Sequence, residues 1–182
     1  MRVLGFDASL TGFGVADTAA PEPRVLVPPA AVGLGWLRID WIYKQVMGVC
    51  DAVPGGRPTV DLVVREGPAY HSATNAYSSG ELWGVIGYAL WRRGIPVVPI
   101  APNTLKKLAT GVGKGLKAGV LVAAVRRLGY TGASDDAADA MWALEAARQH
   151  YDLPGKVALP KSHTETLHKL KWPPLDKLRA SA

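Results

Sequence analysis

The chain has 182 residues, and its 48% hydrophobic content with a mean hydropathy of +0.09 is typical of a globular protein. This length predicts one domain with enough chain to bury a sizeable core. The formal net charge of +6 and the pI of about 9.5 favour a polyanionic partner.

The composition also excludes several classes of protein. The single cysteine, Cys50, rules out an intrachain disulfide and a cysteine-based zinc site, and we interpret it as a small hydrophobic residue of a helix. No apolar stretch approaches the ~20 residues that a bilayer span needs. The N-terminus lacks a signal-peptide pattern, so we expect a cytoplasmic protein with no membrane partner.

The first part of the chain predicts three antiparallel strands. Residues 3–7 form an apolar run, and residues 13–16 return after a turn in which Gly12 supplies a permissive backbone. Residues 24–27 are a short apolar run in a proline-rich stretch, which favours an edge strand.

Helices and strands then alternate. Helical periodicity predicts a helix over residues 35–53, a strand follows at 60–65, and a long helix is expected over 72–93. Each glycine weakens a helix by up to ~1 kcal/mol, so we expect the small residues of the long helix to allow close packing against another helix. These small residues, at helical spacing, are Ala76, Gly80, Gly84 and Gly87.

The last main elements are a strand at residues 95–100, helices at 103–109 and 117–128, and a helix from Ser134 to about His150. The order of elements predicts an α/β fold in which a mixed sheet carries helices on both faces. We divide the chain into a domain of residues 1–150 and a partly ordered basic extension, residues 151–182, that contains four prolines. The residues of the extension that we expect to dock on the domain are Leu167, Leu170 and Trp172.

Four acidic residues are the strongest indication of function. Asp7 and Glu66 each end a strand-like apolar run, and Asp136 and Asp139 lie three residues apart, on one face of the last helix. A carboxylate at the end of a buried strand is costly unless something compensates its charge. Acids from two strands and one helix together predict a site for a hard divalent cation with oxygen ligands.

Each acid alone also has a structural interpretation. Asp7 could cap the turn that follows it, and Glu66 could pair with Arg65 or a lysine at a strand end. Ser134 is a natural N-cap, and Asp136 is favoured at the positive end of the helix dipole. Asp139 is surrounded by apolar neighbours and is harder to explain in this way. The combined order of the four acids favours the metal site.

The chain resembles the RuvC-type Holliday junction resolvases of the RNase H-like superfamily over residues 1–150. The resemblance rests on an opening hairpin LGFDASLTGFGV at residues 4–15 and on Glu66 followed by SGELWG at 79–84. It continues with PNTLK at 102–106, TGVG at 110–113 and DAADAMWAL at 136–144. The tail has no counterpart in the short bacterial pattern, and its presence suggests a phage-encoded variant acting in the host cytoplasm.

This resemblance implies a fold, a set of catalytic residues and a reaction. The fold would be a five-stranded mixed sheet flanked by helices, and Asp7, Glu66, Asp136 and Asp139 would be the catalytic, metal-binding carboxylates. Two Mg²⁺ ions ~3.5–4 Å apart, for which Mn²⁺ could substitute, would stabilise the attacking and leaving oxygens during phosphodiester hydrolysis. The products would be nicks with a 5′-phosphate and a 3′-hydroxyl.

The resemblance also implies how DNA is held. Lys106 and Lys117 match the basic residues of the family near the scissile phosphate, and we expect Lys107 and Lys114 to contact the backbone as well. In the family an aromatic residue inserts at the junction crossover, and here Tyr70, beside the matching position, is the candidate for that role. Two symmetric cuts in a four-way junction imply a homodimer, for which the helix at residues 72–93 is the expected contact.

Other functions stay open on the sequence alone. The same metal chemistry would serve a broader nuclease of flaps, forks or RNA-containing hybrids. A binding-only junction protein would not need all four acids. The opening hairpin also resembles that of actin-like sugar kinases, but those need two such domains and this chain is too short. We further expect the basic tail to add non-specific affinity for DNA.

Overall fold

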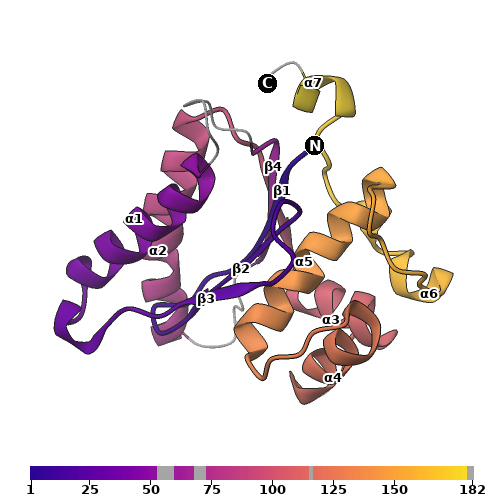
Figure 1. Cartoon of the computed structure of the whole chain (residues 1–182), viewed down its shortest axis with the longest axis horizontal. Coiled ribbons are helices and arrows are strands. Elements are labelled where there is room, and N and C mark those ends of the chain that lie inside the picture. The colour runs from indigo at the N-terminus through magenta and orange to yellow at the C-terminus, as the bar shows by residue number, and fades with distance from the viewer. Residues whose placement is uncertain (53–59, 68–72, 115–116, 180–182) are drawn as a thin grey trace.

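The structure, a computed structural model, describes residues 1–52, 60–67, 73–114 and 117–179. Its centre is a five-stranded mixed sheet in the order β3-β2-β1-β4-β5 (Figure 1). The strands are β1 (Val3–Asp7), β2 (Phe13–Asp17), β3 (Arg24–Leu26), β4 (Leu62–Glu66) and β5 (Val97–Ile100). The expected five-stranded α/β sheet is thereby confirmed.

The pairing of the strands follows their sequence patterns. β1 pairs antiparallel with β2 and parallel with β4, while β3 lies antiparallel to β2 and β5 parallel to β4. The central strands are buried on both faces, which explains why they are continuous apolar runs instead of alternating ones. β3 is short and partly exposed, as expected for an edge strand.

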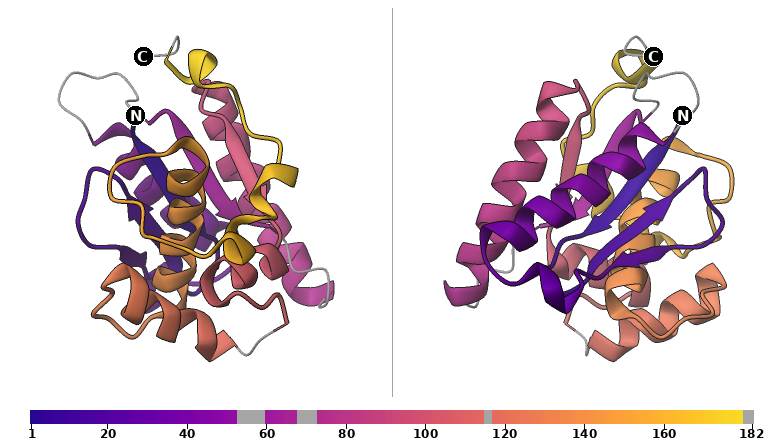
Figure 2. Two further views of the ribbon diagram at one scale, coloured as in Figure 1. Left: turned by 90° about the vertical axis from the view of Figure 1, so that its right-hand side faces the viewer. Right: turned by 60° about the vertical axis from the view of Figure 1, so that its left-hand side comes forward.

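Helices cover both faces of the sheet (Figures 1 and 2). One face carries α1 (Trp36–Asp51) and α2 (Ala73–Arg92), and the other carries α5 (Asp135–Tyr151) with α3 (Pro102–Thr110) and α4 (Lys117–Leu128) behind it. Short helical turns complete the chain: η1 (Ala30–Val32), α6 (Lys161–Thr164), η2 (Leu167–Lys169) and α7 (Leu175–Arg179). None of the helices within the described ranges is long and apolar enough to cross a membrane.

The element boundaries differ from the sequence expectation by only one or two residues. The largest differences are two residues, at the starts of β4 and β5, expected at 60 and 95, and at the end of α1, expected at 53. The expected limits at residues 53 and 72 lie outside the described residues. Val60 and Ile95 are buried but lie outside the hydrogen-bonded ladder. Their apolar side chains made the expected strands longer than the segments that pair. Ser134 is the N-cap of α5, as predicted, since its hydroxyl accepts a hydrogen bond from the Ala137 amide at 3.3 Å.

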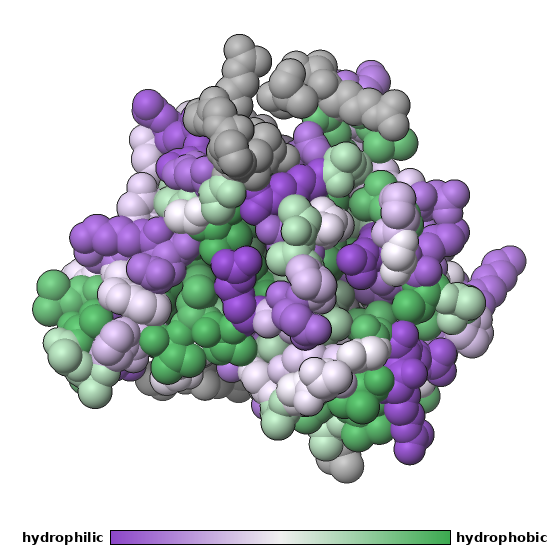
Figure 3. Space-filling view, in the orientation of Figure 1, coloured by the Kyte–Doolittle hydropathy of each residue, from purple (hydrophilic) through white to green (hydrophobic). Residues whose placement is uncertain are grey.

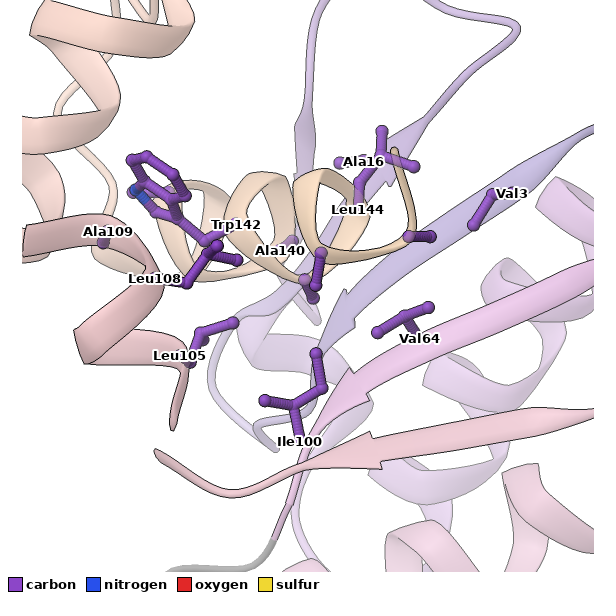
Figure 4. Packing of buried hydrophobic residues seen from close by; sticks show 14 of the residues in the cluster. Val3, Ala16, Val64, Ile100, Leu105, Leu108, Ala109, Ala140, Trp142 and Leu144 are labelled. Carbon is purple, nitrogen blue, oxygen red and sulfur yellow. The ribbon is translucent and has the colours of Figure 1, made fainter. Parts of the chain in front are cut away.

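The α5 helix lies unusually close to the sheet. A Cβ placed on Gly5 would lie 2.1 Å from the Ala140 carbonyl oxygen, and one on Gly14 would lie 2.0 Å from the Asp136 carbonyl oxygen. Glycine at both positions therefore lets the backbone of α5 rest directly on β1 and β2. Around this contact, Figure 4 shows larger side chains filling the space between α5, α3 and the sheet: Val64, Ile100, Leu105, Leu108 and Trp142.

The glycines of α2 do not allow a similar close contact with any described part of the chain. A Cβ on Gly80, Gly84 or Gly87 would meet nothing within 4 Å. The expected close packing against another helix is therefore not made to any described part of the same chain. The outer side of α2 instead exposes three aromatic rings: Tyr77, Tyr88 and Trp91.

The tail packs against the α3 and α5 side of the molecule. Leu167 is buried in the core cluster of that side, and Leu170 and Trp172 pack against the cluster, so the expected docking of these three residues is confirmed. The short helix α7 lies near the N-terminus of the chain (Figure 1). It contributes the buried Leu178 to the same cluster.

Candidate metal centre

Three of the four singled-out acids meet at one end of the sheet. Asp7 ends β1 and Glu66 ends β4, and because these strands are parallel and in register from Val3 opposite Leu62 to Phe6 opposite Arg65, their acids emerge side by side. Asp139 reaches the same point from the second turn of α5. One carboxylate oxygen from each of Asp7, Glu66 and Asp139 lies within 4.8 Å of the other two.

The burial of these acids makes the cluster informative. Asp139 is only 6% exposed, while Asp7 and Glu66 are half-buried. Three carboxylates this close repel one another, and burial adds a desolvation cost to the charged form. An oxygen-only set of this kind fits a hard divalent cation, whose charge offsets both costs.

Asp136 lies beside the cluster and not within the group of three. A Cβ placed on Gly12 would lie 2.8 Å from the Asp136 Oδ2 atom. The Asp136 carboxylate therefore faces the turn between β1 and β2. Asp136 also lies in the first turn of α5, at the positive end of the helix dipole. Its neighbour Asp135 is exposed, which agrees with the choice of Asp136 and Asp139 as the relevant pair.

Backbone contacts fix the positions of Asp139 and Glu66. Asp139 is placed by the close approach of α5 to Gly5 and Gly14. Beyond Glu66, the Gly67 amide donates to the Ile100 carbonyl oxygen at 2.6 Å, which extends the ladder between β4 and β5 past the acid. The end of β4 is therefore held on both sides, by β1 and by β5.

Arg65 is a neighbour of the site that the sequence indicated only as a possible charge partner of Glu66. Its guanidinium lies 4.1 Å from the ring centroid of Trp83 on α2 and donates to the Glu66 carbonyl oxygen at 3.1 Å. A cation over an aromatic face is held in place, so Arg65 links the end of β4 to α2. The only signal in the sequence was its position directly before Glu66.

The residues predicted to contact DNA differ in exposure and in their partners. Lys106 is half-buried on α3 and Lys114 is exposed in the following loop. Lys107, on the same helix, is held in an ion pair with Glu165 of the tail, a partner that the sequence did not indicate. Lys117 begins α4, but its side chain, like Tyr70 as a whole, lies outside the described residues.

Cys50 lies far from this chemistry. It is fully buried in the core between α1, α2 and the sheet, and burial raises the pKa of its thiol to about 12. A thiol held neutral in this way is a packing residue, as expected from the sequence.

Comparisons with known proteins agree with this geometry. The chain is 33% identical over 150 residues to the crossover junction endodeoxyribonuclease RuvC of Rhodococcus opacus, covering 78% of this chain and 77% of that protein. It is 29% identical over 161 residues to the protein of the same name from Halorhodospira halophila, covering 84% and 93% of the two chains. No protein-family model matches the chain.

Solved structures give the same fold. The structure of Thermus thermophilus RuvC superposes with a TM-score of 0.64 at 24% identity, covering 86% of this chain and 98% of that one. The same protein in complex with a Holliday junction substrate superposes with a TM-score of 0.63 at 22% identity, covering 87% and 99%.

Proposed function

The chain belongs to the RuvC family of crossover junction endodeoxyribonucleases, and from this premise we propose that it resolves four-way DNA junctions by paired, symmetric nicks. The observation that supports this most strongly is the convergence of Asp7, Glu66 and Asp139 within 4.8 Å at the ends of two parallel strands. A cluster of this chemistry serves phosphodiester hydrolysis, and the net charge of +6 suits a polyanionic substrate.

We propose that the carboxylates hold two Mg²⁺ ions, with Mn²⁺ able to substitute. Bound there, the ions would supply electrostatic stabilisation of the attacking and leaving oxygens of an in-line displacement. Asp7 would be the acid that both ions share, because its strand β1 both pairs with β4 and packs against α5. Glu66 and Asp139 would each hold one ion, and Asp136 would complete the set. The products would carry a 5′-phosphate and a 3′-hydroxyl.

The lysines of α3 and of the loop that follows would hold the DNA backbone. α3 begins two residues after β5, and β5 ends opposite Glu66, so this helix starts beside the carboxylates. We propose that Lys106 and Lys117 contact the phosphates nearest the cleaved bond, with Lys107 and Lys114 further along the backbone. Tyr70 stays a candidate for the residue that inserts at the crossover.

A homodimer would place two such sites on one junction. The outer side of α2 supports this proposal, because its glycines leave room for a second backbone and its Tyr88 and Trp91 rings are 59% and 70% exposed. Aromatic residues are enriched at the buried centre of an interface. A two-fold axis beside α2 would make the contact self-complementary.

Two further expectations remain proposals of the same kind. We propose that residues 1–150 form the nuclease domain and that residues 151–182 are an addition to it. We also propose that the protein works in the cytoplasm, where its DNA substrates are. A phage origin remains a prediction from the sequence.

Cleavage of a matched set of substrates tests the proposed function. End-labelled four-way junction, flap, fork and RNA–DNA hybrid would be incubated with the protein and Mg²⁺ under identical conditions. Paired nicks at symmetric positions of the junction, with little cutting of the others, are expected. Equal or faster cutting of flaps, forks or hybrids would assign a broader branched-DNA nuclease. Tight junction binding without any cutting would assign a binding protein.

A further inference from the structure

The tail docks on α3, the helix that carries two of the predicted DNA-binding lysines, Lys106 and Lys107. His163 of α6 is 6% exposed, and its Nδ1 donates to the Leu108 carbonyl oxygen at 2.8 Å, near the C-terminal end of α3. The imidazole also covers Gly111, where a Cβ would lie 2.8 Å from its Nε2 and where the backbone has a φ of +80°. Gly111 therefore leaves the space that His163 fills, and the contact fixes α6 beside α3 (Figure 2).

A second anchor holds the other end of the same segment. The indole of Trp172 donates to the Leu167 carbonyl oxygen at 2.8 Å and stacks on the ring of His150 at 4.5 Å with an interplanar angle of 11°. Leu167, between the two anchors, is buried. Residues 161–171 are thus held at both ends and in the middle, so their charged side chains start from fixed backbone positions.

The charges of this docked segment are nearly all positive. Glu165 is the sole acidic residue in the sequence from 161 to 171, and its Oε1 lies 2.5 Å from the Nζ of Lys107 on α3. Hydrogen bonding and attraction to Lys107 lower the pKa of Glu165. In Figure 3, hydrophilic residues on the right-hand side, where α6 lies in Figure 1, are interspersed with hydrophobic ones. The exposed basic residues of the segment are Lys161, His168, Lys169 and Lys171.

We propose that α3 and the docked segment, residues 161–171, form a second DNA-binding surface. It binds the phosphates of a duplex arm outside the cleavage centre. Glu165 pairs with Lys107 in the free protein, and a DNA phosphate replaces the Glu165 carboxylate on binding. The proposal rests on the function proposed above, because it assumes a branched DNA substrate whose arms are duplex. Lysines on a fixed scaffold lose less freedom on binding than lysines on a loose tail. Exchange is feasible because the side chains of Lys107 and Glu165 are 27% and 49% exposed, and exposed ion pairs are weak.

Point substitutions test this surface better than truncation. Removing the chain after His150 would delete the buried His163 and Leu167 and uncover the core, whereas surface substitutions leave the anchors intact. Lys169→Gln and Lys171→Gln would be made in the Asp7→Asn background, so that binding is measured without cutting. Lys44→Gln on α1 removes the same charge from an exposed lysine on the opposite face and is the control.

The measurement is the dissociation constant for a four-way junction over a range of salt concentrations. Loss of one phosphate contact is expected to lower the slope of log affinity against log salt by ~0.9 for Lys169→Gln or Lys171→Gln, and by nothing for Lys44→Gln. Glu165→Gln is expected to strengthen binding by at most about fivefold, which corresponds to ~1 kcal/mol at 1.4 kcal/mol per tenfold. Its salt slope should increase, because Lys107 becomes available to phosphate.

Two results would overturn the proposal. One is a salt slope for both tail lysine variants that equals the slope of Lys44→Gln, and the other is unchanged or weaker binding by Glu165→Gln. The same titrations on a linear duplex separate this proposal from the proposed function. A parent that binds duplex as tightly as a junction would count against junction selectivity, while the lysine variants would still report on the surface.

Discussion

The two faces of the sheet are packed in different ways. On the α5 face, backbone meets backbone at Gly5 and Gly14, and the helix is rich in buried alanines. On the α1 and α2 face, large side chains fill the space between helices and sheet, while the helix glycines lie open at the surface. The residues that fill the second face include Phe6, Ile42, Leu82, Ile86 and Leu90.

This difference shows which face can tolerate change. The position of Asp139 depends on the direct contact between the backbone of α5 and the backbones of β1 and β2, where no side chain can repack to absorb a change. The α1 and α2 face is held by many flexible contacts, and its outer surface is available for a partner. The same substitution, glycine to alanine, should therefore have opposite effects on the two faces.

The largest effect is expected for Asp139→Asn, compared with Asp135→Asn one turn earlier on α5. Asp139 is buried within the cluster and Asp135 is exposed. Loss of residues that only support a metal ligand costs 10- to 100-fold, so loss of Asp139 should cost at least ~100-fold in the rate of junction cleavage. Asp135→Asn should cut within about twofold of the parent, since surface substitutions are usually near neutral. Equal losses in the two variants would contradict the assignment of α5.

The next effect tests the contact between backbones. Gly14→Ala places a methyl group against the Asp136 carbonyl oxygen and should shift α5. Overpacking of this kind costs ~1–3 kcal/mol, and a displacement of about 1 Å costs ~100-fold in rate. Urea unfolding and junction cleavage would measure both.

The control for that substitution lies on the other face. Gly48→Ala on α1, where a Cβ meets nothing within 4 Å, should stabilise the helix by up to ~1 kcal/mol and leave cleavage unchanged. If Gly14→Ala were as stable and active as Gly48→Ala, the close approach of α5 would not control the site.

A smaller effect is expected at the outer surface of α2. Trp91→Ser should weaken the proposed homodimer by ~30-fold, as for an interface residue worth ~2 kcal/mol. Trp36→Ser is the matched control, because Trp36 is 63% exposed on α1. Sedimentation equilibrium would give both dissociation constants. A parent that stays monomeric at micromolar concentration would refute this interface.

The smallest effect concerns the second buried carboxylate of α5. Glu145 Oε1 accepts hydrogen bonds from Gln149 at 2.6 Å and from the Val157 amide at 3.0 Å. Its Oε2 accepts no hydrogen bond from any described residue and lies 3.7 Å from the Arg148 guanidinium. Burial raises the pKa of Glu145 above its unfolded value. The native state therefore takes up a proton at higher pH than the unfolded chain does.

The sign of the pH dependence follows from this shift. The stability of the parent relative to Glu145→Gln should increase as the pH falls through the raised native pKa, and should level off below the unfolded pKa. Urea unfolding of both proteins between pH 7 and pH 4 would measure the difference. A difference that does not vary with pH would show that this carboxyl is not protonated on folding.

Much of the fold was predictable because its signals are local. Apolar runs marked the strands, Ser134 marked the start of α5, and the order of elements fixed the mixed sheet. The convergence of Asp7, Glu66 and Asp139 followed from the topology, because parallel strands end at the same edge. The number of strands in the sheet, five, was implied by the resemblance.

The remaining features depend on contacts between distant residues. Glycine at positions 5 and 14 permits the α5 contact, but a strand glycine alone does not reveal what approaches it. Likewise Lys107 looked like its neighbour Lys106, and the sequence could not show that Glu165, 58 residues later, would pair with it. The docking of His163 on α3 was hidden for the same reason.

The central claim is that the carboxylates at the ends of β1, β4 and α5 form the nuclease centre of a junction resolvase. The most direct test is cleavage of an end-labelled four-way junction with Mg²⁺ by the parent protein and by Asp7→Asn, with junction binding measured for both. We predict paired symmetric nicks by the parent, and no nicks but retained binding by the variant. Cutting by Asp7→Asn at the rate of the parent would contradict the claim.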